Sequence, residues 1–405
     1  MNTYKNNFSK FLLLLFFSVY YAYQFIYRII TNIISDYLIN KYYIQYESIS
    51  QFASVWYIGY VLSHIPIAIL LELISIKKIM FFSMIINILG FIPLLYLDDF
   101  FFSVLGRFFI GLGSSASSLG AFKVFLFLFN KKKFPIMLSI MTFFGLLTAS
   151  FFTNFSEVFI NTFGWMKTMN ILIILGIIIS FISLVIIPKK KNNKVFSISE
   201  VKFNFKYILD NPIIILISIA GGLMIGPLEG FADAWSNQYL YSIYNIKNNI
   251  SSNVTQIIYC GMSFGLIIYG KIIEKNKSYY NLLIINAIIM LIFFSFIISK
   301  VIININLLKL FYFIMGFSCS YQIIVINKNI SIAKTKHKVF VSSITNMIMM
   351  FFGWFYHQSI GKMLKFNMLY FNCKTYYFFY SLIIINIGIF FSILIFIILN
   401  NIKNK

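Results

Sequence analysis

Apolar residues along the chain form long runs, separated by short polar segments rich in lysine. Each run is close to the ~20 residues that an α-helix needs to cross a bilayer. The pattern therefore predicts twelve transmembrane helices. Six are expected in the first half of the chain, over residues 11–34, 51–74, 79–97, 100–127, 134–155 and 166–187. Six more are expected in the second half, over residues 212–235, 253–273, 279–299, 301–326, 340–364 and 376–399.

A central polar stretch divides these predicted helices into two equal groups. It covers residues 188–211 and contains six lysines. Two groups of spans around one loop are typical of secondary transporters built from repeated halves. We expect an all-α polytopic membrane protein with an N-terminal six-helix half over residues 1–187, a cytoplasmic loop over 188–211 and a C-terminal six-helix half over 212–405.

The composition excludes most other classes of protein. Of the 405 residues, 60% are hydrophobic and only 11% are charged, whereas soluble domains carry roughly 25% charged residues. Such a chain is neither a soluble enzyme nor a disordered protein. The three cysteines show no metal-like or paired spacing, and no P-loop is present. We therefore predict no metal, no cofactor and no direct use of ATP.

The formal net charge is +22, and the distribution of the basic residues among the loops indicates the orientation in the membrane. If the N-terminus is cytoplasmic, 22 of the 33 basic residues fall in cytoplasmic segments, seven fall outside and four lie within spans. Cytoplasmic loops of membrane proteins carry this kind of excess of Lys and Arg. We expect both termini in the cytoplasm, and we expect no nucleic-acid partner because the charge does not form a basic face.

Two loops carry related charged motifs next to helix ends. Residues 68–78 read A-I-L-L-E-L-I-S-I-K-K after the second predicted helix, and residues 270–275 read G-K-I-I-E-K after the eighth. Both resemble the G-x-x-x-D-[RK]-x-G-[RK]-[RK] motif of the major facilitator superfamily, with Glu in place of Asp. The resemblance implies gating residues that hold the inward side shut; ordinary charges that snorkel at helix ends are the alternative. The candidates are Glu72, Lys77, Lys78, Gly270, Glu274 and Lys275.

Other motifs support the same family. The fourth predicted helix carries Arg107, Gly111 and Gly113, similar to the family's R-x-x-x-G-x-G pattern, and the eleventh carries Asn346 and Gln358. The chain thus resembles bacterial major facilitator transporters over nearly its whole length. The resemblance implies two six-helix bundles in an inner membrane, with a central cavity lined by helices 1, 4, 7 and 10.

Charged residues inside the predicted spans are the candidate binding residues, because charge within a bilayer is costly and marks substrate or ion pathways. Both arginines of the chain, Arg28 and Arg107, lie within spans, in the outer half of the membrane on this topology. Gln24 and Tyr27 lie close to Arg28 on helix 1. Three further candidates are expected at a similar depth in helices 7 and 10, namely Glu229, Asp233 and Lys309.

Two roles are open for these charges. Arginine forms bidentate bonds to carboxylate or phosphate, so Arg28 and Arg107 would bind an anionic group of a solute, while Glu229 or Asp233 would bind an amine or a proton. Alternatively, fixed ion pairs such as Arg28 with Asp233 only hold the outer gate.

The sequence therefore predicts a secondary transporter or facilitator rather than an enzyme. It would move a small organic solute, anionic or zwitterionic, by alternating access, with protons as a candidate coupling partner and the monomer as the working unit. The competing hypothesis is a transporter-like protein that does not transport and acts as a sensor or assembly partner in the membrane, since the first charged motif is degraded.

Overall fold

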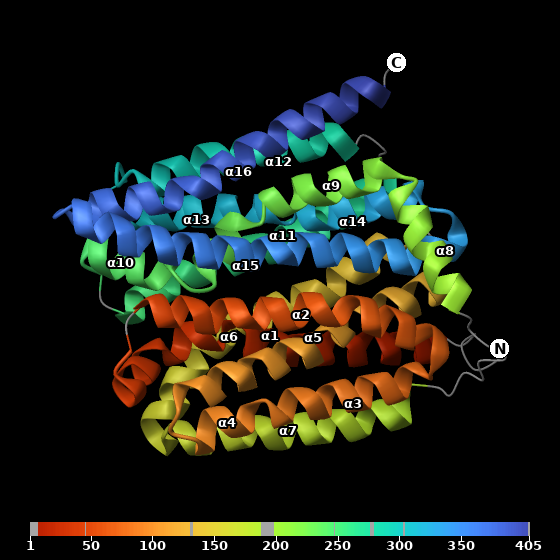
Figure 1. The fold of residues 1–405 in the computed structure, drawn as a ribbon, viewed down its shortest axis with the longest axis horizontal. Coiled ribbons are helices and arrows are strands. Elements are labelled where there is room, and N and C mark those ends of the chain that lie inside the picture. Colours follow the sequence, from red (N-terminus) through yellow and green to blue (C-terminus); the bar gives the residue numbers. More distant parts are fainter. Residues whose placement is uncertain are drawn as a thin grey trace.

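The structure is a computed structural model that describes residues 7–44, 46–129, 133–187, 198–246, 248–275, 279–302 and 304–403. All regular elements in these ranges are helices (Figure 1). Eleven of them are long and apolar enough to cross a membrane, and a bent pair brings the number to twelve. The predicted all-α polytopic fold is confirmed.

The first half of the chain forms one group of helices, drawn from red to yellow-green in Figure 1. Asp99 caps α5 by accepting a hydrogen bond from the backbone NH of Phe101 at 2.8 Å. Gly164, with φ of +81°, makes the sharp turn between α6 and α7. The helices of this group are α1 (Asn7–Tyr42), α2 (Tyr46–Leu73), α3 (Ile76–Leu89), α4 (Phe91–Tyr96), α5 (Phe100–Leu128), α6 (Phe134–Phe163) and α7 (Trp165–Ile186).

The second half forms the other group, drawn from green to blue. Its long helices are broken more often than those of the first half. The segments are α9 (Pro212–Leu223), the π-helical η2 (Gly226–Ala232), α10 (Ser236–Tyr244), α11 (Asn248–Lys275), α12 (Tyr279–Ile298), α13 (Ile305–Cys319), α14 (Tyr321–Ile332), the short 3₁₀ turn η3 (Thr335–His337), α15 (Lys338–Tyr370) and α16 (Lys374–Lys403).

The seventh predicted helix, residues 212–235, is not continuous. The axis bends by 45° between α9 and η2. Gly226 and Pro227 open η2, and proline cannot donate the backbone hydrogen bond that would continue α9. The break places Glu229 in a π-helical turn and Asp233 directly after it.

The central polar stretch contains a helix of its own, α8 (Ile198–Leu209). Tyr207 of α8 stacks on His337 with ring centroids 4.0 Å apart, and His337 Nδ1 contacts Asn204 Oδ1 at 2.5 Å. These contacts hold α8 against the turn between α14 and α15. Residues 188–197 of the predicted loop lie outside the described residues, so the domain boundaries at 187 and 211 stay a prediction.

The two groups meet along two pairs of helices. α2 packs along α15, and α6 packs along α11. Glycines allow the close approach: a side chain at Gly361 of α15 would crowd Ser50 of α2, and one at Gly270 of α11 would crowd Ser139 of α6. Small residues have this role at helix interfaces in lipid, where backbones must come close for van der Waals contact.

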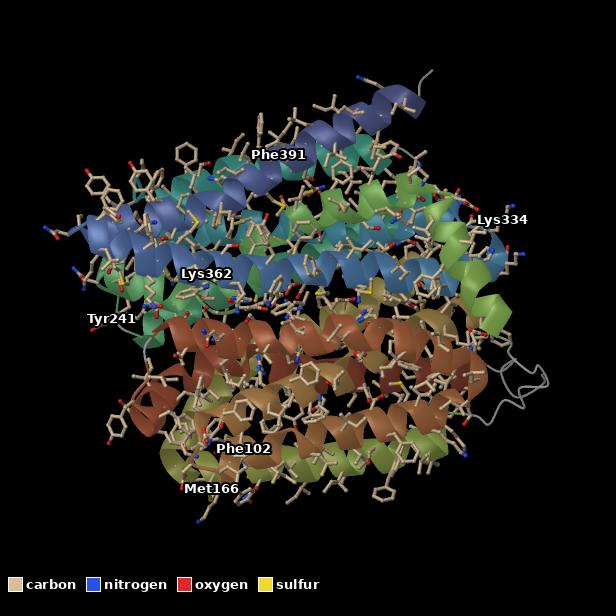
Figure 2. All side chains as sticks on the ribbon, in the orientation of Figure 1. Phe102, Met166, Tyr241, Lys334, Lys362 and Phe391 are labelled. Atoms are coloured by element: carbon tan, nitrogen blue, oxygen red, sulfur yellow. The ribbon has the colours of Figure 1, made fainter. Side chains whose placement is uncertain are left out.

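The outer surface of the bundle is apolar. Phe102, Met166 and Phe391, labelled in Figure 2, are 42%, 48% and 52% exposed. Many polar side chains lie in the interior instead, among them Ser114, Asn286 and other buried serines and asparagines. This distribution suits a hydrocarbon solvent, and the chain is an integral, multi-pass membrane protein.

Candidate functional site

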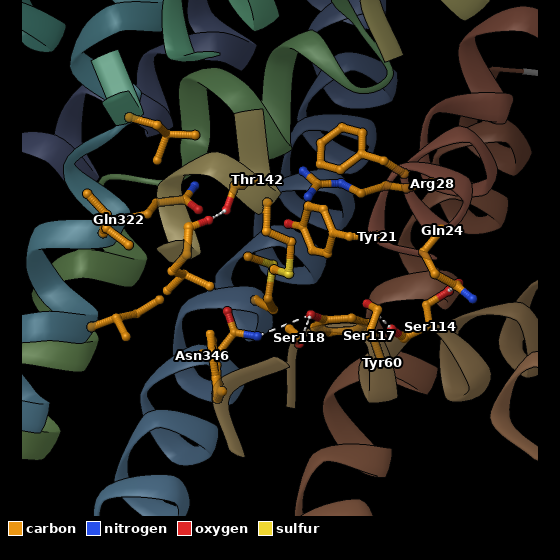
Figure 3. Close-up of a pocket in the computed structure, with 18 of the residues that line it drawn as sticks. Tyr21, Gln24, Arg28, Tyr60, Ser114, Ser117, Ser118, Thr142, Gln322 and Asn346 are labelled. Atoms are coloured by element: carbon orange, nitrogen blue, oxygen red, sulfur yellow. Dashed lines mark hydrogen bonds between the residues drawn. The ribbon is translucent and has the colours of Figure 1, made fainter. Parts of the chain in front are cut away.

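A cavity lies between the two halves, in the middle of the bundle (Figure 3). Its first-half wall is largely polar, and much of its second-half wall is apolar. Arg28 is the one charged side chain among its lining residues in the described part of the chain. The polar lining residues are Tyr21, Gln24, Arg28, Tyr60, Ser114, Ser117, Ser118, Thr142, Gln322 and Asn346; the apolar wall of the second half consists of Met262, Leu266, Ile323, Ile326 and Met350.

Arg28 forms ion pairs with two carboxylates of the opposite half. Its Nε donates to Asp233 Oδ2 at 2.9 Å, and its terminal NH2 group pairs with Glu229 Oε2. All three side chains are buried. The contact connects α1 of the first half directly to η2 and the residue that follows it. The ion pair considered as an alternative from the sequence, Arg28 with Asp233, is therefore present.

Two tyrosines and a glutamine complete this network. Tyr57 of α2 lies within hydrogen-bonding distance of Asp233 Oδ2, at 2.6 Å, and of Glu229 Oε2, at 2.9 Å. Tyr259 of α11 donates to the second oxygen of Asp233 at 2.6 Å, and Gln322 Nε2 donates to Glu229 Oε1 at 3.3 Å. Hydrogen-bond donors from both halves thus surround the two carboxylates, which buried charges require.

The formal charge of this group is negative. Arg28 contributes one positive charge, whereas Glu229 and Asp233 contribute two negative charges. Buried ion pairs are stabilising only when further hydrogen bonds satisfy the charged atoms. Arg28 alone therefore does not balance the formal charge of the two carboxylates.

Gln24 lies one turn before Arg28 and faces the same cavity. Its Oε1 accepts hydrogen bonds from Asn87 Nδ2 at 2.8 Å and from Ser114 Oγ at 2.6 Å. These bonds connect α1 to α3 and α5 within the first half. Because they fix the rotation of α1, they also fix the direction in which Arg28 points.

Arg107 is placed differently from Arg28. One terminal nitrogen donates to the backbone carbonyl of Tyr27, and the other donates to the carbonyl of Arg28 at 2.7 Å and to Thr31 Oγ1 at 2.9 Å. Arg107 is not among the cavity-lining residues. It binds the backbone of α1 behind Arg28 and positions that helix.

Tyr27 and Lys309 also lie away from the cavity wall. The Tyr27 hydroxyl contacts that of Tyr23, which in turn donates to the Leu172 carbonyl of α7 at 2.7 Å. Lys309 is half-buried near the start of α13. Their roles in binding stay predictions, and the geometry favours Arg28, Gln24, Glu229 and Asp233 over both.

A second polar contact joins the halves at the other side of the cavity. Asn346 Nδ2 of α15 contacts Tyr60 Oη at 3.1 Å and His64 Nε2 at 3.0 Å, both of α2. The opposite ring nitrogen of His64 contacts the Tyr60 carbonyl at 2.6 Å. Because a carbonyl only accepts, these contacts fit a neutral histidine whose Nδ1 carries the proton.

Of the predicted gating residues, Gly270 is buried, Glu72 and Lys77 are half-buried, and the others are exposed. Glu72 pairs with Lys123 of α5 at 2.9 Å, and Lys77 donates to the Leu184 carbonyl at 3.4 Å, so both connect helices within the first half. Of the second motif, Gly270 contacts Ser139 in the opposite half. The remaining candidates are exposed, namely Lys78, Glu274 and Lys275.

The sequence did not single out Tyr57, Tyr259 or Gln322. Each is an uncharged polar residue in a chain with 27 tyrosines and many amides. Only their distance from Glu229 and Asp233 in space identifies them.

Comparisons with known proteins agree with this architecture. A protein named TsgA homolog, from Buchnera aphidicola subsp. Acyrthosiphon pisum strains Tuc7, 5A and APS, is 25% identical over 346 residues, which cover 82% of each chain. Two crystal structures of a bacterial homologue of the human lysosomal transporter Spinster share the fold. The inward-facing, unoccupied form gives a TM-score of 0.71 at 13% identity over 97% of each chain, and the inward-facing, occupied form gives 0.70 at 13% over 98% of each chain.

The family model described as Major Facilitator Superfamily matches residues 12–357. This range includes Arg28, Glu229 and Asp233, as well as both charged loop motifs. The family makes the protein a transporter of small molecules across the bilayer rather than an enzyme. The chain belongs to the Major Facilitator Superfamily.

Proposed function

We propose that this transporter moves a small organic solute that carries an anionic group, by alternating access and with coupling to protons. The working unit is a monomer in a bacterial inner membrane, with both termini cytoplasmic. The observation that carries the proposal is the position of Arg28, which lines the central cavity and also binds two carboxylates of the opposite half.

The single cationic side chain in the cavity wall supports an anionic group on the solute. Arg28 is its one charged lining residue within the described ranges. A guanidinium in a low-dielectric site is a strong partner for a carboxylate or phosphate, because it offers a planar pair of donors. Gln322 and Asn346 from the second half offer amide groups to the same space.

The carboxylates behind Arg28 support coupling to protons. A solute anion that binds the Arg28 guanidinium weakens the bonds between Arg28 and the two carboxylates, Glu229 and Asp233. A buried carboxylate without a full partner is costly unless it becomes neutral. Binding of the anion is therefore favoured when one carboxylate takes up a proton. A zwitterionic solute would supply an ammonium group in place of that proton.

The same network supports alternating access. The bonds from Arg28 and Tyr57 to Glu229 and Asp233 tie the two halves together at one depth. On the predicted topology this depth is in the outer half of the membrane. If these bonds are replaced by bonds to the solute and to a proton, the two halves are no longer tied together on the outer side. They can then rock relative to each other.

Uptake and counterflow in proteoliposomes, with a panel of small carboxylates, phosphates, amino acids and neutral sugars, test the proposal. We expect an anionic or zwitterionic solute to be moved and a neutral sugar not to be moved. Arg28→Lys keeps the charge but loses the planar pair of donors, and we expect uptake to fall at least tenfold. Lys362→Gln, which removes an exposed cation from α15, is the control and should retain uptake.

The same panel separates the transporter from the non-transporting sensor. A purified, folded protein that binds a solute in a thermal-shift assay but moves nothing would favour the sensor. Uptake of neutral solutes alone, or wild-type uptake by Arg28→Lys, would contradict the proposed anion site.

A further inference from the structure

A second cavity lies far from the central one, between the start of α1, the end of α5 and the start of α6. It is at the end of the bundle where the N-terminus lies in Figure 1. Two lysines contribute to its wall, one from α1 and one from just before α6. The lining residues that matter here are Lys10, Lys133, Leu14, Leu128, Phe129 and Met137.

The two lysines have no acidic counterpart in this cavity. None of its lining residues is an aspartate or glutamate, and neither Lys10 nor Lys133 forms an ion pair within the described ranges. The loop that leads to Lys133 adds Lys131 and Lys132 in sequence and contributes no acid. Within the described residues, Lys10 and Lys133 therefore bring positive charge to this cavity without an acidic partner.

Apart from Asn7, the rest of the cavity wall is apolar, and it reaches the surface that faces lipid. Leu14, Leu128 and Met137 are half-buried around the lysines. Phe11, which also lines the cavity, is 62% exposed. A ligand that fits such a wall has a negative head for the two ammonium groups and a hydrocarbon part that leaves along the helices.

We propose that this cavity binds the phosphate of an anionic phospholipid, with the acyl chains running along α1 and α6. Basic pockets between transmembrane helices hold such headgroups, and each Lys near the membrane surface adds to the attraction for an anionic lipid. Cytoplasmic loops carry an excess of Lys and Arg, which explains why lysines are frequent at this end of the bundle. It does not explain why two of them share a recess with apolar walls.

Native mass spectrometry of the purified full chain tests the site, with phosphatidylglycerol and phosphatidylcholine of matched acyl chains as probes. We expect retention of phosphatidylglycerol in preference to phosphatidylcholine. The double variant Lys10→Gln, Lys133→Gln should bind phosphatidylglycerol about thirtyfold more weakly, given the contribution of two lysines. The control is Lys271→Gln, Lys275→Gln, which removes two exposed lysines from α11 and should leave binding unchanged.

Three outcomes would overturn the proposal. Equal retention of the two lipids would show that the site does not recognise the negative charge of the headgroup. Equal loss in both double variants would show that only the total charge matters. Competition by millimolar inorganic phosphate, without any effect of the acyl chains, would assign the cavity to free phosphate instead. Circular dichroism of each variant confirms that the helices are intact, so a change in binding is not read from an unfolded protein.

Discussion

Arg28 Nε donates to Asp233 Oδ2 at 2.9 Å, across the interface between the two halves of the transporter. The two residues are 205 positions apart in the sequence, and both side chains are buried, at 7% and 4% exposure. Glu229 shares the same guanidinium. One cation thus holds two carboxylates of the other half, and it also lines the cavity between the halves. In the proposed mechanism, this double contact links the bonds between the two halves to the charge of the solute.

A double-mutant cycle on Arg28→Gln and Asp233→Asn should show that the two residues stabilise the protein together. Removal of one member of a buried ion pair costs about 3–5 kcal/mol, because the remaining charge loses its partner. We expect each single variant to lower the melting temperature in detergent, and the double variant to lower it by less than the sum. Strictly additive shifts would mean that the pair contributes no coupling.

Arg107→Lys should disturb the site indirectly, by loosening the part of α1 that carries Arg28. Arg107 donates to the carbonyls of Tyr27 and Arg28 and to the hydroxyl of Thr31, and a single ammonium cannot reproduce that arrangement. Hydrogen bonds from a charged group contribute about 1.5–3 kcal/mol each. We expect a lower melting temperature and reduced uptake with membrane insertion intact. Unchanged uptake and stability would show that α1 does not depend on Arg107 for its position.

His357→Met should not destabilise the protein. His357 is fully buried, its ring lies 5.4 Å from that of Tyr57, and neither ring nitrogen has a hydrogen-bond partner in the described part of the molecule. An unsatisfied buried polar group costs about 1–3 kcal/mol, and methionine fills a similar volume without that cost. The melting temperature should stay equal or rise. Asn346→Ala, which removes satisfied bonds to Tyr60 and His64, should lower it.

Cys373 offers a test of membrane orientation. It is exposed between α15 and α16, whereas Cys319 is buried and Cys260 is half-buried. Hydrogen bonding from the backbone of Thr375 lowers the pKa of the Cys373 thiol, so its reactive thiolate persists to lower pH than usual. On the predicted topology this loop is outside. A maleimide that cannot cross membranes should label intact cells, faster as pH rises, and Cys373→Ser should abolish labelling.

Labelling of Cys373 only after the cells are opened would place that loop in the cytoplasm. The termini would then lie outside, and the orientation inferred from the lysines would be wrong. The positive-charge bias would in that case need another explanation.

The helices could be predicted from the sequence because hydropathy acts locally. The span predicted over residues 100–127 is α5, Phe100–Leu128, and the one predicted over 166–187 is α7, Trp165–Ile186. The break at Gly226 and Pro227 was not predicted, although both residues are visible, because a sequence does not say whether a proline kinks or ends a span.

The site could be predicted only in part. The sequence indicates how deep a residue lies in the membrane, but it does not indicate in which direction its side chain points. Charge and position placed Arg28 and Asp233 at a common depth in different helices. Arg107 is equally charged, but its side chain turns toward the α1 backbone, and only the rotation of α5 decides that. Tyr57 carries no signal at all, because its role depends on contact with Glu229, 172 positions away.

Simultaneous recording of solute uptake and lumenal pH in one set of proteoliposomes tests the central claim most directly. With an anionic solute found in the panel, the wild-type protein should move solute and protons together, because the proposed mechanism has Arg28 bind the solute while Glu229 or Asp233 takes up a proton. Arg28→Gln should move neither. Solute uptake by Arg28→Gln at the wild-type rate, or wild-type uptake of the anion with no change in lumenal pH, would contradict the account.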